Sequence, residues 1–217
     1  MAFAFPLGVT AAGYLAECSG EGHVIRIIRL CINTLAGVPS IVFGLFGVAF
    51  FVTFLLPRFG FPKGSSILAG ALTLAVLVLP VVIRASEEAI RSVPGTYKEA
   101  SLALGASPFW TFVKVTLPTA LPGILTGVIL SMSRAAGETA PILFTAAVAL
   151  GPVPRSIAQP TRALSYGAYD MAVGDRIAAM VPHNQYGMVM TLILLVLLLN
   201  VGAIVVRSRM SRKLRGQ

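Results

Sequence analysis

An arginine and a glutamate four residues apart, Arg134 and Glu138, stand inside an otherwise apolar stretch of the sequence. Residues at this spacing lie on one face of a helix, so the two charges can partly neutralise each other. A charge within a membrane span costs about 2.5–3.5 kcal/mol on insertion scales and by default indicates a path for a polar solute. Two alternatives stay open, namely a structural ion pair between helices and an arginine that reaches the membrane surface.

The chemistry of this pair suits an oxyanion. The planar fork of an arginine donates hydrogen bonds in pairs to a tetrahedral anion, and a neighbouring carboxylate can hold the arginine or accept a hydrogen bond from a protonated anion. Because phosphate keeps an acidic proton near neutral pH and sulfate does not, an acceptor carboxylate favours phosphate. Three small residues share the helix face with the pair, within an arc of about 80°: Gly123 and Gly127, where we expect helix packing, and Ser131.

The elements that must position these residues are membrane spans. The chain has 217 residues, of which 56% are hydrophobic and 12% charged, against about 25% charged residues in a soluble domain. A span needs about 20 largely apolar residues, so we predict an all-α polytopic bundle. The predicted spans are Ile32–Leu56, Ile67–Ile83, Thr119–Ala140 and Met188–Val206, with a shorter fifth one at Met1–Ala16.

The short first span shapes the expected domain organisation. It begins at the initiator without the positive flank of a secretion signal. We therefore expect residues 1–217 to form one transmembrane domain that is short at its N-terminus and carries about five of six spans.

The basic residues predict the orientation of the spans. Of the 17 Lys and Arg residues, eleven fall in alternate loops on one side, which marks that side as cytoplasmic. Residues 84–118 then form a cytoplasmic loop, residues 151–187 an external loop, and the C-terminus is cytoplasmic. Because the basic residues lie in short clusters between apolar runs, the net charge of +9 favours loops at a membrane over nucleic-acid binding.

The cytoplasmic loop carries helix signals. Thr96 and Glu99 have the spacing of a capping box, and Gly105 can end the resulting helix over residues 97–104 in a left-handed conformation. Ser107 then caps a second helix over residues 108–116. Phe109, Trp110 and Phe112 crowd this second helix, so we predict a docking surface; the alternative is that the rings pack back against the helix ends.

The residues disfavour catalysis and metal binding by this chain. The sequence has no Gly-x-x-x-x-Gly-Lys-Ser/Thr phosphate loop, and the predicted spans contain no His or Asp and no Glu besides Glu138. Cys18, Cys31 and His23 do not make a four-ligand zinc site. His183 has no second ligand nearby in the sequence and is expected to be an ordinary loop residue.

The cytoplasmic loop resembles the EAA loop of ABC importer permeases, whose pattern is Glu-Ala-Ala, three residues, Gly, nine residues, Ile-x-Leu-Pro. Ser101 and Val115 are mild departures. The resemblance implies a type I importer permease fold, with this loop seated on a separate ATPase subunit that uses ATP and Mg²⁺. It implies no cofactor bound by this chain and the following coupling residues: Glu99, Ala100, Ser101, Gly105, Phe109, Trp110, Leu117 and Pro118.

The segment around the charged pair, SRAAGETAP at 133–141, resembles the Arg-x-x-Gly-Glu-Thr-Ala-Pro signature of PstA-type permeases of phosphate-specific ABC importers. Residues 6–17 and 33–45 resemble the same family, and in the latter we expect Ser40 and Gly44 to pack against another helix. The resemblance implies that Arg134, Glu138, Ser131 and Thr139 line a phosphate path.

This second resemblance also implies partners: a homologous permease subunit, two ATPase subunits and an external phosphate-binding protein, at a bacterial or archaeal cytoplasmic membrane. Two alternatives remain. One is a related importer for another oxyanion or small solute, and the other is a truncated permease that does not transport.

Overall fold

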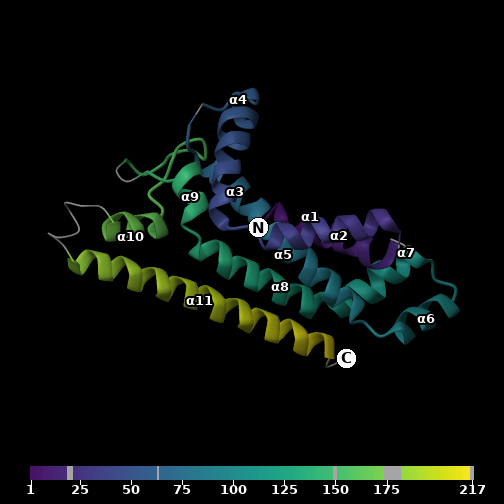
Figure 1. Cartoon of the computed structure of the whole chain (residues 1–217). Coiled ribbons are helices and arrows are strands. Elements are labelled where there is room, and N and C mark those ends of the chain that lie inside the picture. Colours follow the sequence, from purple (N-terminus) through teal and green to yellow (C-terminus); the bar gives the residue numbers. More distant parts are fainter. Residues whose placement is uncertain (19–21, 63, 149–150, 174–181, 216–217) are drawn as a thin grey trace. The chain divides into compact units, whose positions relative to one another are not determined.

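The computed structural model of the chain describes residues 1–18, 22–62, 64–148, 151–173 and 182–215, which are almost entirely helical (Figure 1). Three stretches have the wider turns of a π-helix, at Tyr14–Cys18, Val48–Leu55 and Phe112–Thr116. The α-helices are α1 (Ala4–Gly13), α2 (His23–Ala36), α3 (Ser40–Gly47), α4 (Leu56–Arg58), α5 (Ile67–Arg91), α6 (Gly95–Ala103), α7 (Pro108–Thr111), α8 (Leu117–Gly137), α9 (Ala140–Thr145), α10 (Leu164–Val173) and α11 (Pro182–Arg215).

Among the described residues, four continuous helical stretches are long and apolar enough to cross a membrane. They are Ser40–Arg58, Ile67–Arg91, Pro108–Gly137 and Tyr186–Arg209, with mean hydropathies between 1.6 and 2.9. Each overlaps one of the four longer predicted spans. The shorter fifth span predicted at Met1–Ala16 is helical as well, but it does not reach this length.

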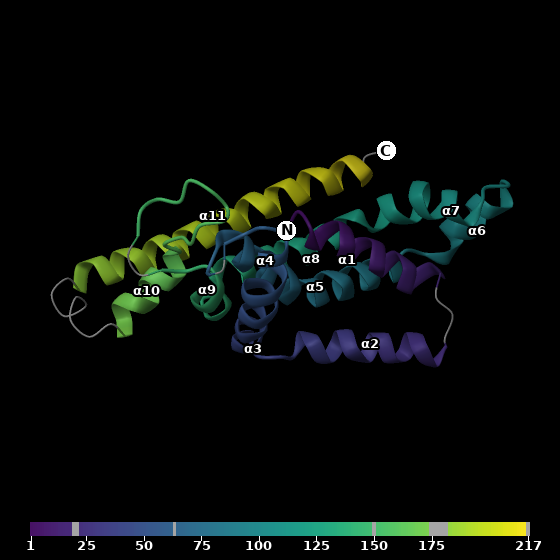
Figure 2. The same ribbon diagram turned by 90° about the horizontal axis from the view of Figure 1, so that it is seen from above.

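The predicted span Ile32–Leu56 is wrong at its start, because the helix breaks between α2 and α3 (Figure 2). Pro39 adopts an extended conformation with φ −57° and ψ 140° and precedes the first residue of α3. Proline has no N–H to donate and disfavours helical geometry in the residue before it. The first five residues of the predicted span therefore belong to α2, and the span itself begins at Ser40.

The predicted boundary at residue 119 is also wrong, since the helix that begins at Pro108 runs on into α8. The N–H of Leu117 donates to the carbonyl of Phe112, five residues earlier. A wider turn of this kind accommodates Pro118, which lacks an N–H. At the other end α8 stops at Gly137 and not at Ala140, because Pro141 cannot donate a helical hydrogen bond to the carbonyl of Gly137.

Contacts divide the chain into two compact units. The first contains residues 1–37, 78–132 and 200–217, and the second contains residues 38–77 and 133–199. The core of the first unit is aliphatic and includes the fully buried Ile90 and Ile124. Within it, a Cβ atom at Gly123 would lie 2.7 Å from Cβ of Ala89, and one at Gly127 would overlap Ala85. The two glycines thus let α8 approach α5 closely.

In the second unit, α9 packs against α3. A Cβ atom at Gly44 would lie 2.9 Å from the Phe144 ring and 3.1 Å from Cα of Pro141, while one at Gly47 would overlap Thr73. Ser40 begins α3 and is half-buried. The six residues of α9 are too few to cross a bilayer.

Candidate functional site

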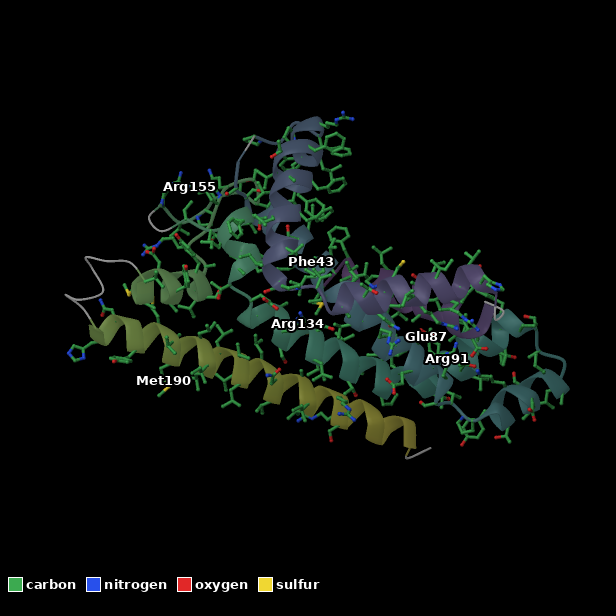
Figure 3. All side chains as sticks on the ribbon, in the orientation of Figure 1. Phe43, Glu87, Arg91, Arg134, Arg155 and Met190 are labelled. Atoms are coloured by element: carbon green, nitrogen blue, oxygen red, sulfur yellow. The ribbon has the colours of Figure 1, made fainter. Side chains whose placement is uncertain are left out.

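The structure brings Arg134, labelled in Figure 3, together with Glu138 at the end of α8. The Nε atom of Arg134 lies 3.2 Å from Oε1 of Glu138, and the two side chains are 38% and 15% exposed. The nitrogen that makes this contact is Nε, and not one of the two terminal nitrogens of the guanidinium. An arginine held in this way by a carboxylate presents a fork that can donate to an anion.

The other two predicted path residues have different surroundings. Ser131 is fully buried, and its hydroxyl donates to the carbonyl of Gly127 at 2.9 Å. Thr139 is half-buried and precedes the first residue of α9, with its carbonyl accepting from the N–H of Leu143 at 2.9 Å. Neither side chain has a hydrogen bond to the charged pair among the bonds that the described residues show.

Sequence reasoning missed one residue that supports the pair. The hydroxyl of Ser165 in α10 donates to the backbone carbonyl of Glu138 at 3.3 Å, and Ser165 is buried. Because α8 ends at Gly137, this carbonyl has left the regular helix and needs a donor. Ser165 lies 27 residues further along the chain, so the sequence does not indicate that its hydroxyl donates to this carbonyl.

The first helix of the loop at residues 84–118 ends as predicted. Gly105 has φ +86°, and its N–H donates to the carbonyl of Leu102 at 2.9 Å, while the N–H of Ala106 donates to that of Ser101 at 3.2 Å. These two bonds form a Schellman motif, which requires the left-handed conformation that glycine adopts most readily.

The predicted capping box at the start of the same helix is wrong. The helix begins at Gly95, directly after an extended Pro94, and no side chain caps its first turn. The N–H of Tyr97 donates to the carbonyl of Pro94 at 3.2 Å. Thr96 therefore lies inside the helix, where its hydroxyl cannot act as a cap.

The second half of the loop is fixed to the first. Ser107 caps α7 as predicted, since its hydroxyl accepts from the N–H of Trp110 at 3.2 Å. The hydroxyls of Ser101 and Thr111 lie 2.9 Å apart and are both buried. This bond gives a physical reason for Ser101, which departs from the alanine of the EAA pattern.

The aromatic residues of the loop divide between two environments. Phe109 is 77% and Trp110 51% exposed, and Leu104 next to the turn is 90% exposed. Phe112 instead turns inward, and its ring packs on Gly13. Of the remaining predicted coupling residues, Glu99 and Ala100 are exposed, whereas Leu117 and Pro118 are half-buried in the continuing helix.

A buried glutamate at the start of the segment 84–118 was also missed. Oε1 of Glu87, whose side chain is 9% exposed, accepts from Nε of Arg29 at 2.9 Å and lies 3.1 Å from Nη2 of Arg91 (Figure 3). Arg29 also donates to the carbonyl of Leu15 at 2.8 Å, and a second ion pair joins Lys98 to Glu17. The four-residue spacing of Glu87 and Arg91 was visible in the sequence, but the contact with Arg29 was not.

The described part of the loop at residues 151–187 is bonded to the start of α5. The N–H groups of Ile67 and Leu68 donate to the carbonyls of Gln159 and Ile157 at 2.9 and 3.0 Å. The loop thereby satisfies donors that the first turn of a helix leaves free. His183 is exposed. Asp175 and Arg176, which the sequence placed in this loop, lie outside the described residues.

The fold occurs in a solved transporter. A chain of the MetNI methionine ABC transporter in an inward-facing conformation superposes with a TM-score of 0.76 at 19% identity, covering 96% of this chain and 88% of that one. A second crystal form of that transporter gives a TM-score of 0.67. The predicted all-α permease fold is confirmed.

Sequence relatives confirm the resemblance to ABC permeases and to their PstA-type members. The probable ABC transporter permease protein YqgI of Bacillus subtilis is 47% identical over 146 residues, which are 67% of this chain and 48% of that protein. The phosphate transport system permease protein PstA 1 of Mycobacterium tuberculosis H37Rv is 45% identical over 140 residues, 64% and 43% of the two chains. PstA of Xylella fastidiosa 9a5c is 40% identical over 141 residues, 65% and 47% of the two chains.

The matched part of the chain spans about half the length of these relatives. A family match covers nearly all of the chain, from residue 4 to residue 216. The chain belongs to the family of inner membrane components of binding-protein-dependent transport systems.

Proposed function

We propose that the chain is the permease subunit of an ATP-driven importer of inorganic phosphate, and that Arg134 and Glu138 contact phosphate on its path. The observation that carries this proposal is the ion pair at the end of α8, inside a segment that matches the phosphate permease signature over its full spacing. Relatives that are 40–45% identical are named phosphate transport system permeases.

The ion pair has the chemistry that phosphate recognition needs. The carboxylate of Glu138 holds Arg134 at Nε, so the outer edge of the guanidinium is free to donate to two oxygens of one anion. When a hydrogen phosphate binds, Glu138 accepts a hydrogen bond from the hydroxyl group that the anion still carries. Sulfate at neutral pH carries no proton, so it cannot donate a hydrogen bond to the carboxylate of Glu138. The unpaired carboxylate disfavours binding of sulfate.

The same proposal assigns the energy input to the cytoplasmic loop. Leu104, Phe109 and Trp110 form an exposed apolar surface that an ATPase subunit would cover, with ATP and Mg²⁺ bound by that subunit. A second permease subunit, two ATPase subunits and an external phosphate-binding protein complete the assembly. The excess of basic residues on one side supports an orientation with this loop and the C-terminus in the cytoplasm.

The test is uptake of radiolabelled phosphate into vesicles that contain the complete importer, with ATP enclosed inside the vesicles. Arg134→Ala should abolish uptake while the ATPase subunits still co-purify with the permease. Arg134→Lys is the matched variant, because it keeps the charge but loses the two-pronged donor, and should retain only a small part of the uptake. Normal uptake by Arg134→Ala would refute the assignment of this residue.

A permease for another solute is the second candidate, because the relative that is 47% identical carries no substrate in its name. The two candidate functions are separated by measuring how strongly unlabelled sulfate, molybdate and phosphate each reduce the uptake of radiolabelled phosphate. Glu138→Gln provides a sharper comparison, since it should weaken phosphate uptake more than sulfate uptake. Equal competition by all three anions would favour the second candidate.

A further inference from the structure

The span Ser40–Arg58, drawn as α3 and α4 in Figure 1, carries a row of aromatic rings on its exposed side. Phe46, Phe50 and Phe54 follow one another at every fourth position and are 45%, 38% and 47% exposed. The rings of Phe46 and Phe50 stack with centroids 5.3 Å apart, and those of Phe50 and Phe54 lie 6.0 Å apart. The three rings, which we call the phenylalanine ladder, form a continuous strip along the span.

The winding of the helix keeps the ladder straight. In a regular α-helix, residues four apart are offset by about 40° around the axis, so a long row at this spacing drifts to another face. The π-helical stretch Val48–Leu55 counteracts this drift, because its wider turn holds more residues. The ladder therefore stays on one side of the span.

Packing from behind fixes the ladder in place. Phe51 is buried, and its ring meets those of Phe46 and Phe50 edge-on at 5.9 and 5.2 Å. Phe51 in turn belongs to a buried cluster with Leu56 and Ala69. All of these residues lie in the second unit. The strip is thus a preorganised surface of that unit alone.

The ladder ends at an arginine. Arg58 is exposed, and its Cζ atom lies 4.2 Å from the centroid of the Phe54 ring. A guanidinium stacked on a ring uses its face and keeps the N–H donors at its edge for other partners. Arg58 forms no ion pair within the described part of the chain, and the sequence has no acidic residue between Glu21 and Glu87.

The dimensions of the strip match one leaflet of a membrane. Phe46 and Arg58 are separated by about 18 Å along a helix axis, and half of the hydrocarbon core is about 15 Å thick. Because Arg58 is the last residue of the span, the strip runs in the direction of an acyl chain and its charge lies where the phosphates of lipids begin. A protein helix on this strip would have to bring an acidic group to Arg58, whereas an anionic lipid carries both parts in one molecule.

We propose that the phenylalanine ladder and Arg58 bind one anionic phospholipid. An acyl chain lies along Phe46, Phe50 and Phe54, and the edge of the Arg58 guanidinium donates hydrogen bonds to the headgroup phosphate. A headgroup without a cationic amine, such as that of phosphatidylglycerol, is favoured because nothing in it offsets the charge of the phosphate.

The test is photo-crosslinking in the assembled transporter, reconstituted in vesicles with a trace of phosphatidylglycerol or phosphatidylcholine that carries a diazirine in its acyl chain. Mass spectrometry of the digested chain then locates the crosslinks. We expect them between residues 42 and 58, with about five times the yield for phosphatidylglycerol, because one basic residue near anionic lipid contributes about that factor. An absence of crosslinks to these residues would overturn the proposal, since a protein neighbour would then cover the strip. Equal yields for the two lipids would overturn it as well.

Three variants test the assignment of the headgroup. Arg58→Gln should lower the ratio of the two yields about fivefold, to near one. Arg155→Gln is the matched control, because Arg155 is an exposed arginine of the same unit and likewise has no ion pair among the described residues; it should leave the ratio unchanged. Phe54→Leu keeps the charge and removes the ring that positions it, so the ratio should fall about twofold. A ratio that stays near five in Arg58→Gln, or that falls as far in Arg155→Gln, would refute the role of Arg58.

Discussion

Replacing Gly105 by valine should weaken binding of the ATPase through the backbone alone. Gly105 has φ +86°, and a Cβ atom built on it meets nothing within 4 Å. No clash therefore contributes, and the cost is that of a left-handed conformation, about 1–2 kcal/mol for a residue with a side chain. If the loop must keep its turn to bind, the affinity for the ATPase should fall by about 5- to 30-fold.

The assay is a titration of purified ATPase subunits against the permease in nanodiscs. Gly105→Asn should bind nearly as well as the unmodified protein, because asparagine tolerates the left-handed region better than other residues with side chains. Gly22→Val is the matched control, since Gly22 has φ −74°, also has open space around it, and precedes α2. The reasoning fails if Gly105→Val binds as well as Gly22→Val, or if asparagine is as harmful as valine.

Three further substitutions test the packing. Gly47→Val should overfill the contact with its two threonine neighbours and reduce stability by about 1–3 kcal/mol, seen as a lower unfolding midpoint in detergent than for Gly202→Val, which has open space around it. Ser101→Ala should cost about 1–3 kcal/mol by leaving the buried hydroxyl of Thr111 unpaired, and adding Thr111→Val should recover most of this; a double variant no more stable than the single one would contradict the pairing. Glu87→Gln should destabilise by about 1.5–3 kcal/mol, and the difference from the unmodified protein should shrink in 1 M salt because its arginine partners are partly exposed.

Features that depend on a few adjacent residues could be predicted from the sequence. The left-handed Gly105 and the cap at Ser107 follow from local backbone chemistry, and the structure contains both. The apolar runs gave the four long helices because burial in a bilayer depends on length and composition. The pairing of Arg134 with Glu138 follows from helical spacing in the same way.

Two kinds of feature could not be predicted: those where two local signals compete for the start of a helix, and those that depend on contacts between residues far apart in the chain. Hydropathy alone joined α2 to the next span, because Ile32–Ala36 contains no charged residue and only Pro39 interrupts the helix. Thr96 had the right spacing for a cap, but Pro94 started the helix earlier. The bonds from Arg29 to Glu87 and from Ser165 to Glu138 join residues far apart in the chain, so no local pattern announces them.

The hydroxyl bond between Ser101 and Thr111 has a consequence for the affinity of the proposed ATPase partner. Together with the Schellman turn and the Ser107 cap, it closes the two halves of the loop into one rigid piece before any partner arrives. Ordering a flexible segment on binding consumes part of the interaction free energy, and a preorganised surface avoids that loss. If the proposed ATPase subunit docks on Leu104, Phe109 and Trp110, this surface would therefore bind without first having to be ordered.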